Sequence, residues 1–288
     1  MIAIYKKELR TYLTSMIGYV FIAFILVIIG IFFTAYNLQY GYPLFAYTLS
    51  SVTIIFLITV PLLTMRIIAE ETKQKTDQLL YTAPVSVGKI ILGKYLALLT
   101  VFLIPIFIIC LYPLILAQFG TVAFAGSYTA ILGFFLLGSA DIAIGMFISS
   151  ITESQIIAAV LTVGVLYICT YMMSGISSLV PATAIASLLV FTGIILIIGF
   201  IIYYLLHNAV IAALIAAICE TALIIVYFVK SSVLEGAVQN LMGVFDIHTH
   251  FNNFLNDILD LNGLVYFISV IVFFLYMAIQ TIQKRRWS

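Results

Sequence analysis

Residues 69–97 read AEETKQKTDQLLYTAPVSVGKIILGKYLA, a charged stretch between two long apolar ones. Seven of these residues are charged, whereas Asp, Glu, Lys and Arg make up only 8% of the 288-residue chain. Proline disfavours helical geometry in the residue before it, so Pro84 predicts a break between two helices. We expect a helical elbow that continues one apolar segment, turns, and returns along the next.

The composition on either side of this stretch indicates a membrane protein. Hydrophobic residues make up 65% of the chain, and its mean hydropathy is +1.27. A soluble domain carries roughly 25% charged residues, far more than are present here. Apolar runs of about 20 residues recur, and each can cross a bilayer as a helix. We therefore predict an all-α integral membrane protein. The net charge of +1 indicates no particular partner. We expect the chain to contact membrane lipid and not to bind nucleic acid.

Eight membrane-spanning helices are predicted. They cover residues 17–36, 47–68, 95–118, 128–150, 156–174, 184–206, 209–229 and 264–282. Basic residues concentrate in cytoplasmic loops. If the N-terminus is inside, eleven of the twelve lysines and arginines fall on the inner side and only Lys230 falls outside. This pattern predicts a multi-pass protein of the plasma membrane with both termini in the cytoplasm.

Two amphipathic segments flank the spans within what we expect to be a single domain, residues 1–288. In residues 1–16 the apolar side chains recur at helical spacing, which is typical of an amphipathic helix that lies in the membrane interface. The alternative is an ordinary charged lead-in to the first span. The apolar face comprises Tyr5, Leu9, Tyr12, Leu13 and Met16. Residues 230–263 form the long outer segment, where Phe251, Phe254, Leu255 and Ile258 again have helical spacing.

The elbow has the composition of a docking surface. Leu79, Leu80 and Tyr81 supply an apolar anchor, and central apolar anchors with a polar surround are typical of protein interfaces. The polar surround comprises Glu70, Glu71, Lys73, Lys75 and Asp77. A solvated loop is the alternative interpretation.

The stretch 65–97 also resembles the cytoplasmic loop of ABC-2 type (type-2 exporter) ABC transporter permeases, especially the branch associated with gliding motility and nitrous-oxide reductase. The matching positions are Arg66, Glu70, Glu71, Leu79, Leu80, Pro84, Gly93 and Lys94. Residues 143–161, AIGMFISSITESQIIAAVL, resemble the link between the family's fourth and fifth spans, and residues 251–287 resemble its tail. The hairpin expected at 184–229 departs from the six-span pattern of the family's simplest members.

The resemblance implies the membrane-spanning permease subunit of an exporter. Such a subunit pairs with a second copy or homologue and docks on a cytoplasmic ABC ATPase, which binds ATP and magnesium. The implied coupling elbow is residues 69–94, with its coupling helix near 76–82. The implied ATPase-coupling residues are Glu70, Glu71, Lys75, Thr76, Asp77, Leu79, Leu80, Tyr81 and Pro84. A second cytoplasmic contact is implied at Thr152 and Glu153, in the motif SITES.

No catalytic, cofactor or metal site is predicted in this chain. Residues 88–94, GKIILGK, have the spacing of a phosphate-binding loop, but Tyr95 replaces the Ser or Thr that binds magnesium and the context is helical. The motif HTH at 248–250, with Asp246, Asp257 and Asp260, matches no metal-binding spacing and is expected to be a polar loop. Hydrolysis of ATP is therefore expected on a partner chain.

Two acids lie within predicted spans. Asp141 falls midway along the fourth span and Glu220 near the middle of the seventh. Ionisable groups at such depth are costly and indicate function by default, although a neutral, hydrogen-bonded acid facing a neighbouring helix is the alternative. They keep a second hypothesis open, an ion- or proton-coupled secondary carrier. A non-transporting membrane scaffold is the third. The sequence does not indicate the substrate.

Overall fold

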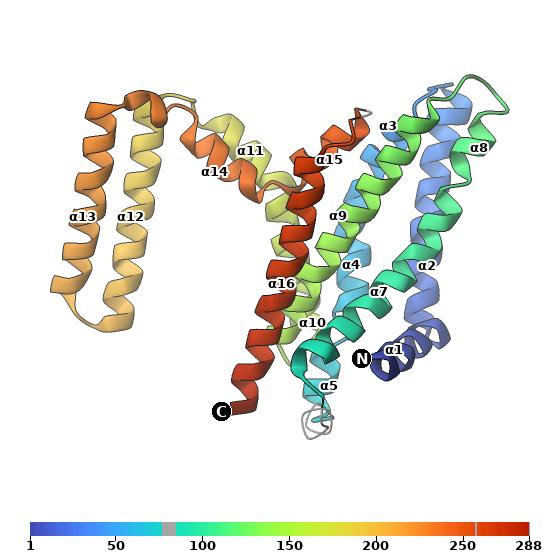
Figure 1. Cartoon of the computed structure of the whole chain (residues 1–288), viewed down its shortest axis with the longest axis horizontal. Helices are drawn as coiled ribbons and strands as arrows, with labels where there is room; N and C mark the ends of the chain where they lie inside the picture. Colours follow the sequence, from blue (N-terminus) through green and yellow to red (C-terminus); the bar gives the residue numbers. More distant parts are fainter. Residues whose placement is uncertain (77–84, 257, 288) are drawn as a thin grey trace. The chain divides into compact units, whose positions relative to one another are not determined.

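A computed structural model describes residues 1–76, 85–256 and 258–287, and this part of the chain is helical without a β-strand (Figure 1). The predicted coupling residues Asp77, Leu79, Leu80, Tyr81 and Pro84 lie outside the described residues. The contacts group the chain into two compact units. Unit 1 comprises Met1–Ile168 with His248–Ser288, and unit 2 comprises Cys169–Ile247.

The helices of unit 1 follow one another in a bundle that is crossed at one end by the first helix. They are α1 (Ile2–Thr14), α2 (Met16–Phe32), the π-helix η1 (Phe33–Gln39), α3 (Phe45–Val52), the 3₁₀-helix η2 (Thr53–Ile55), α4 (Phe56–Thr64), α5 (Ala69–Lys73), α7 (Val87–Ile109), α8 (Tyr112–Leu116), α9 (Phe124–Ile151), α10 (Gln155–Tyr167), α15 (Ile247–Leu255) and α16 (Leu261–Trp287).

Helix α9 is the centre of unit 1. It packs against α3, α4, α7, α10 and α16, and 78% of its most apolar stretch is buried inside the protein. Small residues permit this close approach, as is common between membrane helices. A Cβ atom on Gly138 would lie 2.5 Å from the Phe102 ring, and one on Gly145 would lie 2.4 Å from the Thr64 hydroxyl.

The described residues contain seven helical segments that are long and apolar enough to span a membrane, which supports a multi-pass membrane protein. They are Met16–Gln39, Phe45–Lys73, Val87–Leu116, Phe124–Ile151, Gln155–Leu179, Ala184–Tyr204 and Leu261–Arg285. Each overlaps one predicted span. The remaining prediction, 209–229, falls on a helix that passes the same test only as a pair, Ala213–Val229 with Ser231–Phe245, bent by 111°.

Unit 2 contains a long helical hairpin and two short helices. Its helices are α11 (Met173–Leu179), α12 (Ala184–Leu206), α13 (Ala209–Val229), the 3₁₀-helix η4 (Ser231–Val233) and α14 (Ala237–Phe245), while the π-helix η3 (Ile168–Met172) begins at its boundary. His207 ends α12 in a left-handed conformation, φ 50°. The Asn208 side chain then accepts hydrogen bonds from Val210 N and Ile211 N at 3.1 and 3.3 Å. This capped two-residue turn lets α12 and α13 pack side by side (Figure 1).

The two amphipathic segments contain the helices α1 and α15, and part of each predicted face is buried, whereas Met16 and Ile258 are exposed. Helix α1 ends at Thr14, and Met16 begins α2 with 81% of its surface exposed. The buried residues of α1 are Glu8 and Tyr12. In α15, Phe251 and Phe254 are fully buried, because they fill the space beside Gly133 of α9.

Candidate functional site

Lys94 is the centre of a group of charged residues at the end of unit 1 that holds α1 and α5. Helix α7 begins at Val87, so Lys94 lies one turn or more inside it and is only 2% exposed. Its Nζ atom is 2.8 Å from Glu71 Oε2 and 3.3 Å from Glu8 Oε1, and it donates a hydrogen bond of 2.8 Å to the carbonyl oxygen of Ile67. These contacts offset the cost of taking the ammonium group out of water.

Lys7 closes the group on its exposed side. Its Nζ atom is 3.4 Å from Glu8 Oε1 and 3.3 Å from Glu71 Oε1. Partial burial alone would lower the pKa of Lys7, but the carboxylates of Glu8 and Glu71 outweigh it and raise the pKa above its ordinary value. The two lysines therefore join α1, α5 and α7 through the same two carboxylates. We call Lys7, Glu8, Arg66, Glu70, Glu71 and Lys94 the charged junction.

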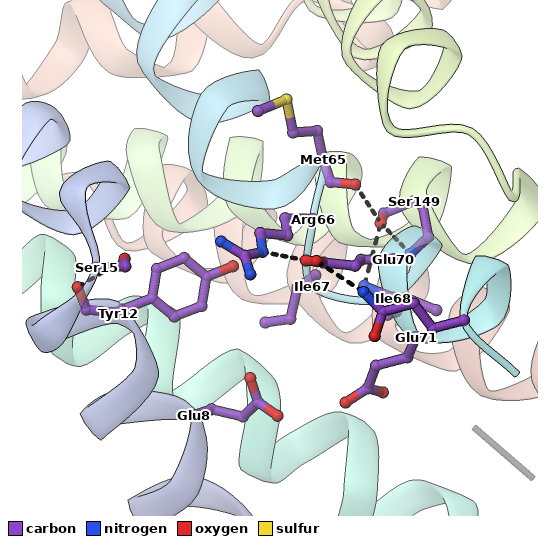
Figure 2. Close-up of polar contacts among 12 residues, drawn as sticks. Glu8, Tyr12, Ser15, Met65, Arg66, Ile67, Ile68, Glu70, Glu71 and Ser149 are labelled. Carbon is purple, nitrogen blue, oxygen red and sulfur yellow. Dashed lines mark hydrogen bonds and ion pairs between the residues drawn. The ribbon is translucent and has the colours of Figure 1, made fainter. Parts of the chain in front are cut away.

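The charged junction includes the break between α4 and α5. Arg66 Nε donates to Glu70 in an ion pair one turn apart. Across the break, the Ser149 hydroxyl of α9 accepts hydrogen bonds from Ile68 N at 3.3 Å and Ala69 N at 3.1 Å. It also donates one of 3.4 Å to the carbonyl oxygen of Met65 (Figure 2). One side chain of α9 thus satisfies the backbone groups that the break leaves without helical partners.

The C-terminal part of α16 holds α5 from another direction. Arg285 donates from Nη1 to the Thr72 hydroxyl at 3.3 Å and from Nη2 to the carbonyl oxygen of Ile151 at 3.0 Å. Helix α5 has only five residues, yet it contacts α1 and α7 through ion pairs, α9 through Ser149 and α16 through Arg285. A displacement of α5 would therefore change its contacts with all four of these helices.

A pocket of about 310 Å³ opens between α1 and α5, beside the charged junction. Glu8, Tyr12, Arg66 and Glu70 are among the residues that line it, and Figure 2 shows these side chains around the space. Tyr12 donates a hydrogen bond of 2.9 Å to the carbonyl oxygen of Leu63. Burial, and then the nearby Glu8 carboxylate, raise the pKa of Tyr12 far above its ordinary value. The phenol is therefore neutral and ties α1 to the end of α4.

The predicted coupling residues that the structure describes fall in two groups. Glu70 and Glu71 belong to the charged junction. Lys75, in a left-handed conformation with φ 57°, and Thr76, which donates to the carbonyl oxygen of Glu71 at 3.3 Å, are exposed at the end of the described segment. Of these four residues, Glu71 pairs with lysines of two other helices, α1 and α7, whereas Glu70 pairs with Arg66 and Gln74 of its own segment.

The predicted second contact lies in the turn between α9 and α10. Glu153 is exposed, and Thr152 donates to the carbonyl oxygen of Ser154 at 3.4 Å. Arg285 links the start of this turn, Ile151, to Thr72 of α5. The two predicted cytoplasmic contacts are therefore joined by one guanidinium group.

The two acids of the predicted spans, Asp141 and Glu220, lie in different units. Asp141 is 2% exposed, and within the described part of the chain its Oδ1 atom has no hydrogen-bond partner. Glu220 accepts a hydrogen bond of 2.9 Å from the Thr192 hydroxyl, while its Oε2 atom is buried without a partner among the described residues. Each acid therefore retains one oxygen that could accept a proton or a ligand.

The histidine motif at 248–250 lies beside side chains with which it makes packing contacts. His250 stacks on Tyr266 with ring centroids 3.9 Å apart. Asp260 accepts hydrogen bonds from Asn253 Nδ2 at 2.7 Å and Asn262 N at 2.9 Å, at the start of α16. The described residues contain no group of three or more His, Cys, Asp or Glu that could hold a metal ion.

Sequence reasoning named Arg66 and Lys94 as positions that match the family pattern but gave neither a site role, and it missed Lys7, Glu8, Ser149 and Arg285. Lys94 also ends the stretch GKIILGK, whose spacing is that of a phosphate-binding loop but which lies within a continuous helix, α7. Glu8 could have been found from its position four residues before Tyr12 on the same helical face. Ser149 and Arg285 have no sequence signal that separates them from other polar residues near helix ends. Neither a protein-family model nor a curated protein matches this chain.

Proposed function

We propose that this chain is the membrane-spanning subunit of an ATP-driven exporter of the ABC-2 type. In this proposal it lies in the plasma membrane with both termini in the cytoplasm and pairs with a second permease. A separate cytoplasmic ATPase binds ATP and magnesium. The observation that carries the proposal is the charged junction, which attaches the base of the predicted coupling elbow to the membrane helices.

A subunit that converts a movement in the cytoplasm into a movement of its spans needs a stiff connection between the two. Helix α5 alone is too short to provide it. The ion pairs of Lys94 with Glu8 and Glu71 supply stiffness, because removing one partner of a buried pair costs about 3–5 kcal/mol. Ser149 and Arg285 add attachments to α9 and α16. A force on residues 77–84 would consequently move the attached helices together.

The first experiment identifies the partner. Tagged protein is purified from its native host in mild detergent, and the proteins that accompany it are identified by mass spectrometry. An ATP-binding subunit in stoichiometric amount is expected, and it should be lost when Leu79, Leu80 and Tyr81 are replaced by Ser. Absence of any ATPase would overturn the proposal, and a stoichiometric partner of another kind would favour a scaffold.

The second experiment separates coupling from docking. A single cysteine at Phe119, which is 72% exposed, reports movement at the far end of unit 1 through its rate of maleimide labelling. Vanadate-trapped nucleotide should change this rate in the otherwise native complex. In Glu8→Gln/Lys94→Met the ATPase should still co-purify, but the labelling rate should no longer respond. Lys89→Met is the matched control, because Lys89 is an exposed lysine of the same helix. An unchanged response in the double variant would refute coupling through the charged junction.

The unpartnered Oδ1 atom of Asp141 favours a second candidate function, an ion- or proton-coupled carrier. A buried acid inside a membrane bundle can bind and release a proton or a cation. This candidate predicts uptake driven by an ion gradient in vesicles that contain this chain alone. Transport should be lost in Asp141→Asn, and the Glu220→Gln variant tests the other acid. Transport that requires an added ATPase would exclude the carrier.

A further inference from the structure

Three tyrosine rings converge at the end of α2 that lies farthest from α5. The ring centroids of Tyr36 and Tyr40 are 6.4 Å apart, those of Tyr36 and Tyr42 are 6.5 Å apart, and those of Tyr40 and Tyr42 are 6.4 Å apart. All three line a pocket of about 410 Å³, together with Ile31, Phe32 and Ala35. We call Tyr36, Tyr40 and Tyr42 the tyrosine cage.

The backbone that carries the tyrosine cage is held in place by a local network. The π-helix η1 ends with Tyr40 N donating to the carbonyl oxygen of Ala35 at 3.0 Å. Gly41, with φ +68°, then reverses the chain, so that Tyr42 N reaches the carbonyl oxygen of Tyr36 at 3.1 Å. A side chain with a Cβ rarely adopts that φ. The three rings are therefore positioned by the turn and not only by contact with one another.

A buried asparagine holds the segment that follows this turn. Asn37 is 3% exposed and donates from Nδ2 to the carbonyl oxygens of Tyr42 at 2.8 Å and Leu44 at 3.4 Å. Its Oδ1 atom accepts a hydrogen bond of 2.6 Å from Thr48, which is fully buried. Satisfied buried networks of this kind specify one arrangement. A π-helical turn within an α-helix is also frequent at functional sites.

We propose that the tyrosine cage binds a quaternary ammonium group, the head of a choline-type membrane lipid. Because the three centroids are so close together, one cation can lie within about 6 Å of all of them, the range over which an aromatic ring attracts a cation. None of the six lining residues is charged, so cation–π attraction rather than an ion pair selects the ligand. Aromatic cages recognise quaternary ammonium groups in this way.

The lining also discriminates between lipid head groups. A primary ammonium carries three N–H donors that need hydrogen-bond acceptors, and the side chains around the pocket offer only phenol oxygens. A quaternary ammonium has no N–H donor, so it loses no hydrogen bond when the rings replace its water, and its desolvation cost is smaller than that of a primary ammonium. The tyrosine cage should therefore prefer phosphatidylcholine over phosphatidylethanolamine.

The position of the pocket favours a lipid over a free cation. Ile31 and Phe32 belong to the span Met16–Gln39, so the pocket sits where that span ends. Val27 and Ile31, each 57% exposed, are four residues apart and lie on one face of α2. They continue the pocket along the span as an apolar track for an acyl chain.

The test compares head groups with identical acyl chains. Purified protein in micelles is incubated with equal amounts of dioleoyl-phosphatidylcholine and dioleoyl-phosphatidylethanolamine, and the retained lipids are counted by native mass spectrometry. A preference for the choline lipid of roughly tenfold is expected, from cation–π contacts to several rings. Equal retention of both lipids would overturn the proposal, because a general belt of interfacial aromatic residues does not discriminate between them.

Variants identify the rings as the cause. Tyr36→Leu/Tyr40→Leu should remove the preference, whereas Tyr36→Phe/Tyr40→Phe should retain it within about threefold, because phenylalanine also attracts cations. Tyr47→Leu is the matched control, since Tyr47 is exposed and its ring, tilted by 39° with its centroid 6.0 Å from that of Tyr42, is not part of the pocket lining. If the Phe variant loses the preference as fully as the Leu variant, hydroxyl contacts and not ring faces bind the ligand, and the proposal fails.

Competition on the unaltered protein distinguishes the two sources of the cation. Tetramethylammonium chloride should displace the bound choline lipid, and sodium chloride at the same concentration should not. Delipidated protein should show no saturable binding of free choline below millimolar concentrations. Saturable binding of free choline without a lipid preference would refute the lipid assignment.

Discussion

Lys94 is a buried charge in a protein that has few charges. Its neighbours are two carboxylates and a backbone carbonyl, so its three donors are all used. The carboxylates are in turn shared with Lys7, which is largely exposed. Without Lys94, the buried Glu8 carboxylate would keep only the exposed Lys7 as a partner. Without the two carboxylates, the Lys94 ammonium would be an uncompensated charge away from water.

Replacing Lys94 by Met should therefore be strongly destabilising. Glu8, which is 6% exposed, would lose its buried partner, and the expected loss is about 3–5 kcal/mol of unfolding free energy. Denaturant titration in micelles measures it. Lys89→Met, at an exposed position of the same helix, should change stability by less than about 0.5 kcal/mol. Equal stability of the two variants would show that Lys94 is not paired.

The Asp260 carboxylate, at the start of α16, should contribute to the stability of the folded protein in a pH-dependent way. Hydrogen bonds from Asn253, and then from the backbone of Asn262 and Gly263, lower its pKa below the ordinary 3.8. A lowered pKa means that the carboxylate stabilises the folded state above pH 3.8 and that this contribution is lost as the pH falls through the folded-state pKa. Thermal unfolding of the native protein and of Asp260→Asn should differ at pH 6 and converge on acidification. A constant difference would contradict the assignment.

At the scale of the element, the joint between α1 and α2 sets where the charged junction lies. Ser15 is extended and accepts a hydrogen bond from Gly18 N at 3.5 Å. Gly18 approaches the preceding helix so closely that a Cβ atom there would lie 2.1 Å from the carbonyl oxygen of Tyr12. The close contact turns α1 across the end of the bundle, and Glu8 then reaches Lys94 (Figure 1).

Gly18→Ala should open this joint. A backbone carbonyl cannot move away as a side-chain end can, so overpacking should cost about 1–3 kcal/mol. Gly30→Ala in the same helix is the control, because its Cβ would meet only the Tyr112 hydroxyl at an ordinary 3.5 Å. The difference is measurable by thermal unfolding and by faster proteolysis of residues 1–15. If both variants behave alike, the joint is more tolerant than its geometry indicates.

For the whole molecule, unit 1 constrains how often the chain crosses the membrane. Helix α10 begins at Gln155, directly after α9 ends at Ile151, and returns along α9. Arg285 donates to Ile151, so α16 runs in the same direction as α9. The chain therefore leaves α10 and enters α16 at the same end of unit 1. If these helices span, the intervening segment crosses an even number of times, and α12 and α13 cross together or not at all.

Since α12 is long and apolar enough to span, we predict that α13 spans as well and that the total is eight. Cysteine mapping tests this after Cys110, Cys169 and Cys219 are replaced by Ala. Asn208→Cys should be labelled from the same side as Ala3→Cys, and Ser231→Cys from the opposite side. Labelling of Asn208→Cys and Ser231→Cys from one side would mean that the hairpin does not cross.

The membrane class and the positions of seven candidate spans were predictable from the sequence, because a spanning helix satisfies its backbone hydrogen bonds within itself. Its length and apolarity are properties of one contiguous segment. The helical hairpin at 184–229 and the amphipathic nature of the N-terminal segment were also predictable, because each depends on residues that are close together in the chain. The predicted face of that first helix was wrong at Met16, since Ser15 ends the helix before it.

Only the tertiary structure decided which polar groups meet. Lys94 and Glu8 are 86 residues apart, and their ion pair depends on how α1 turns at Gly18 and how α7 is rotated against it. The tyrosine cage similarly depends on the π-helix and on Gly41, which bring Tyr42 back beside Tyr36. Hydrophobicity is additive along a segment and can be seen in one sequence, whereas the rotation and approach of helices result from many contacts made together.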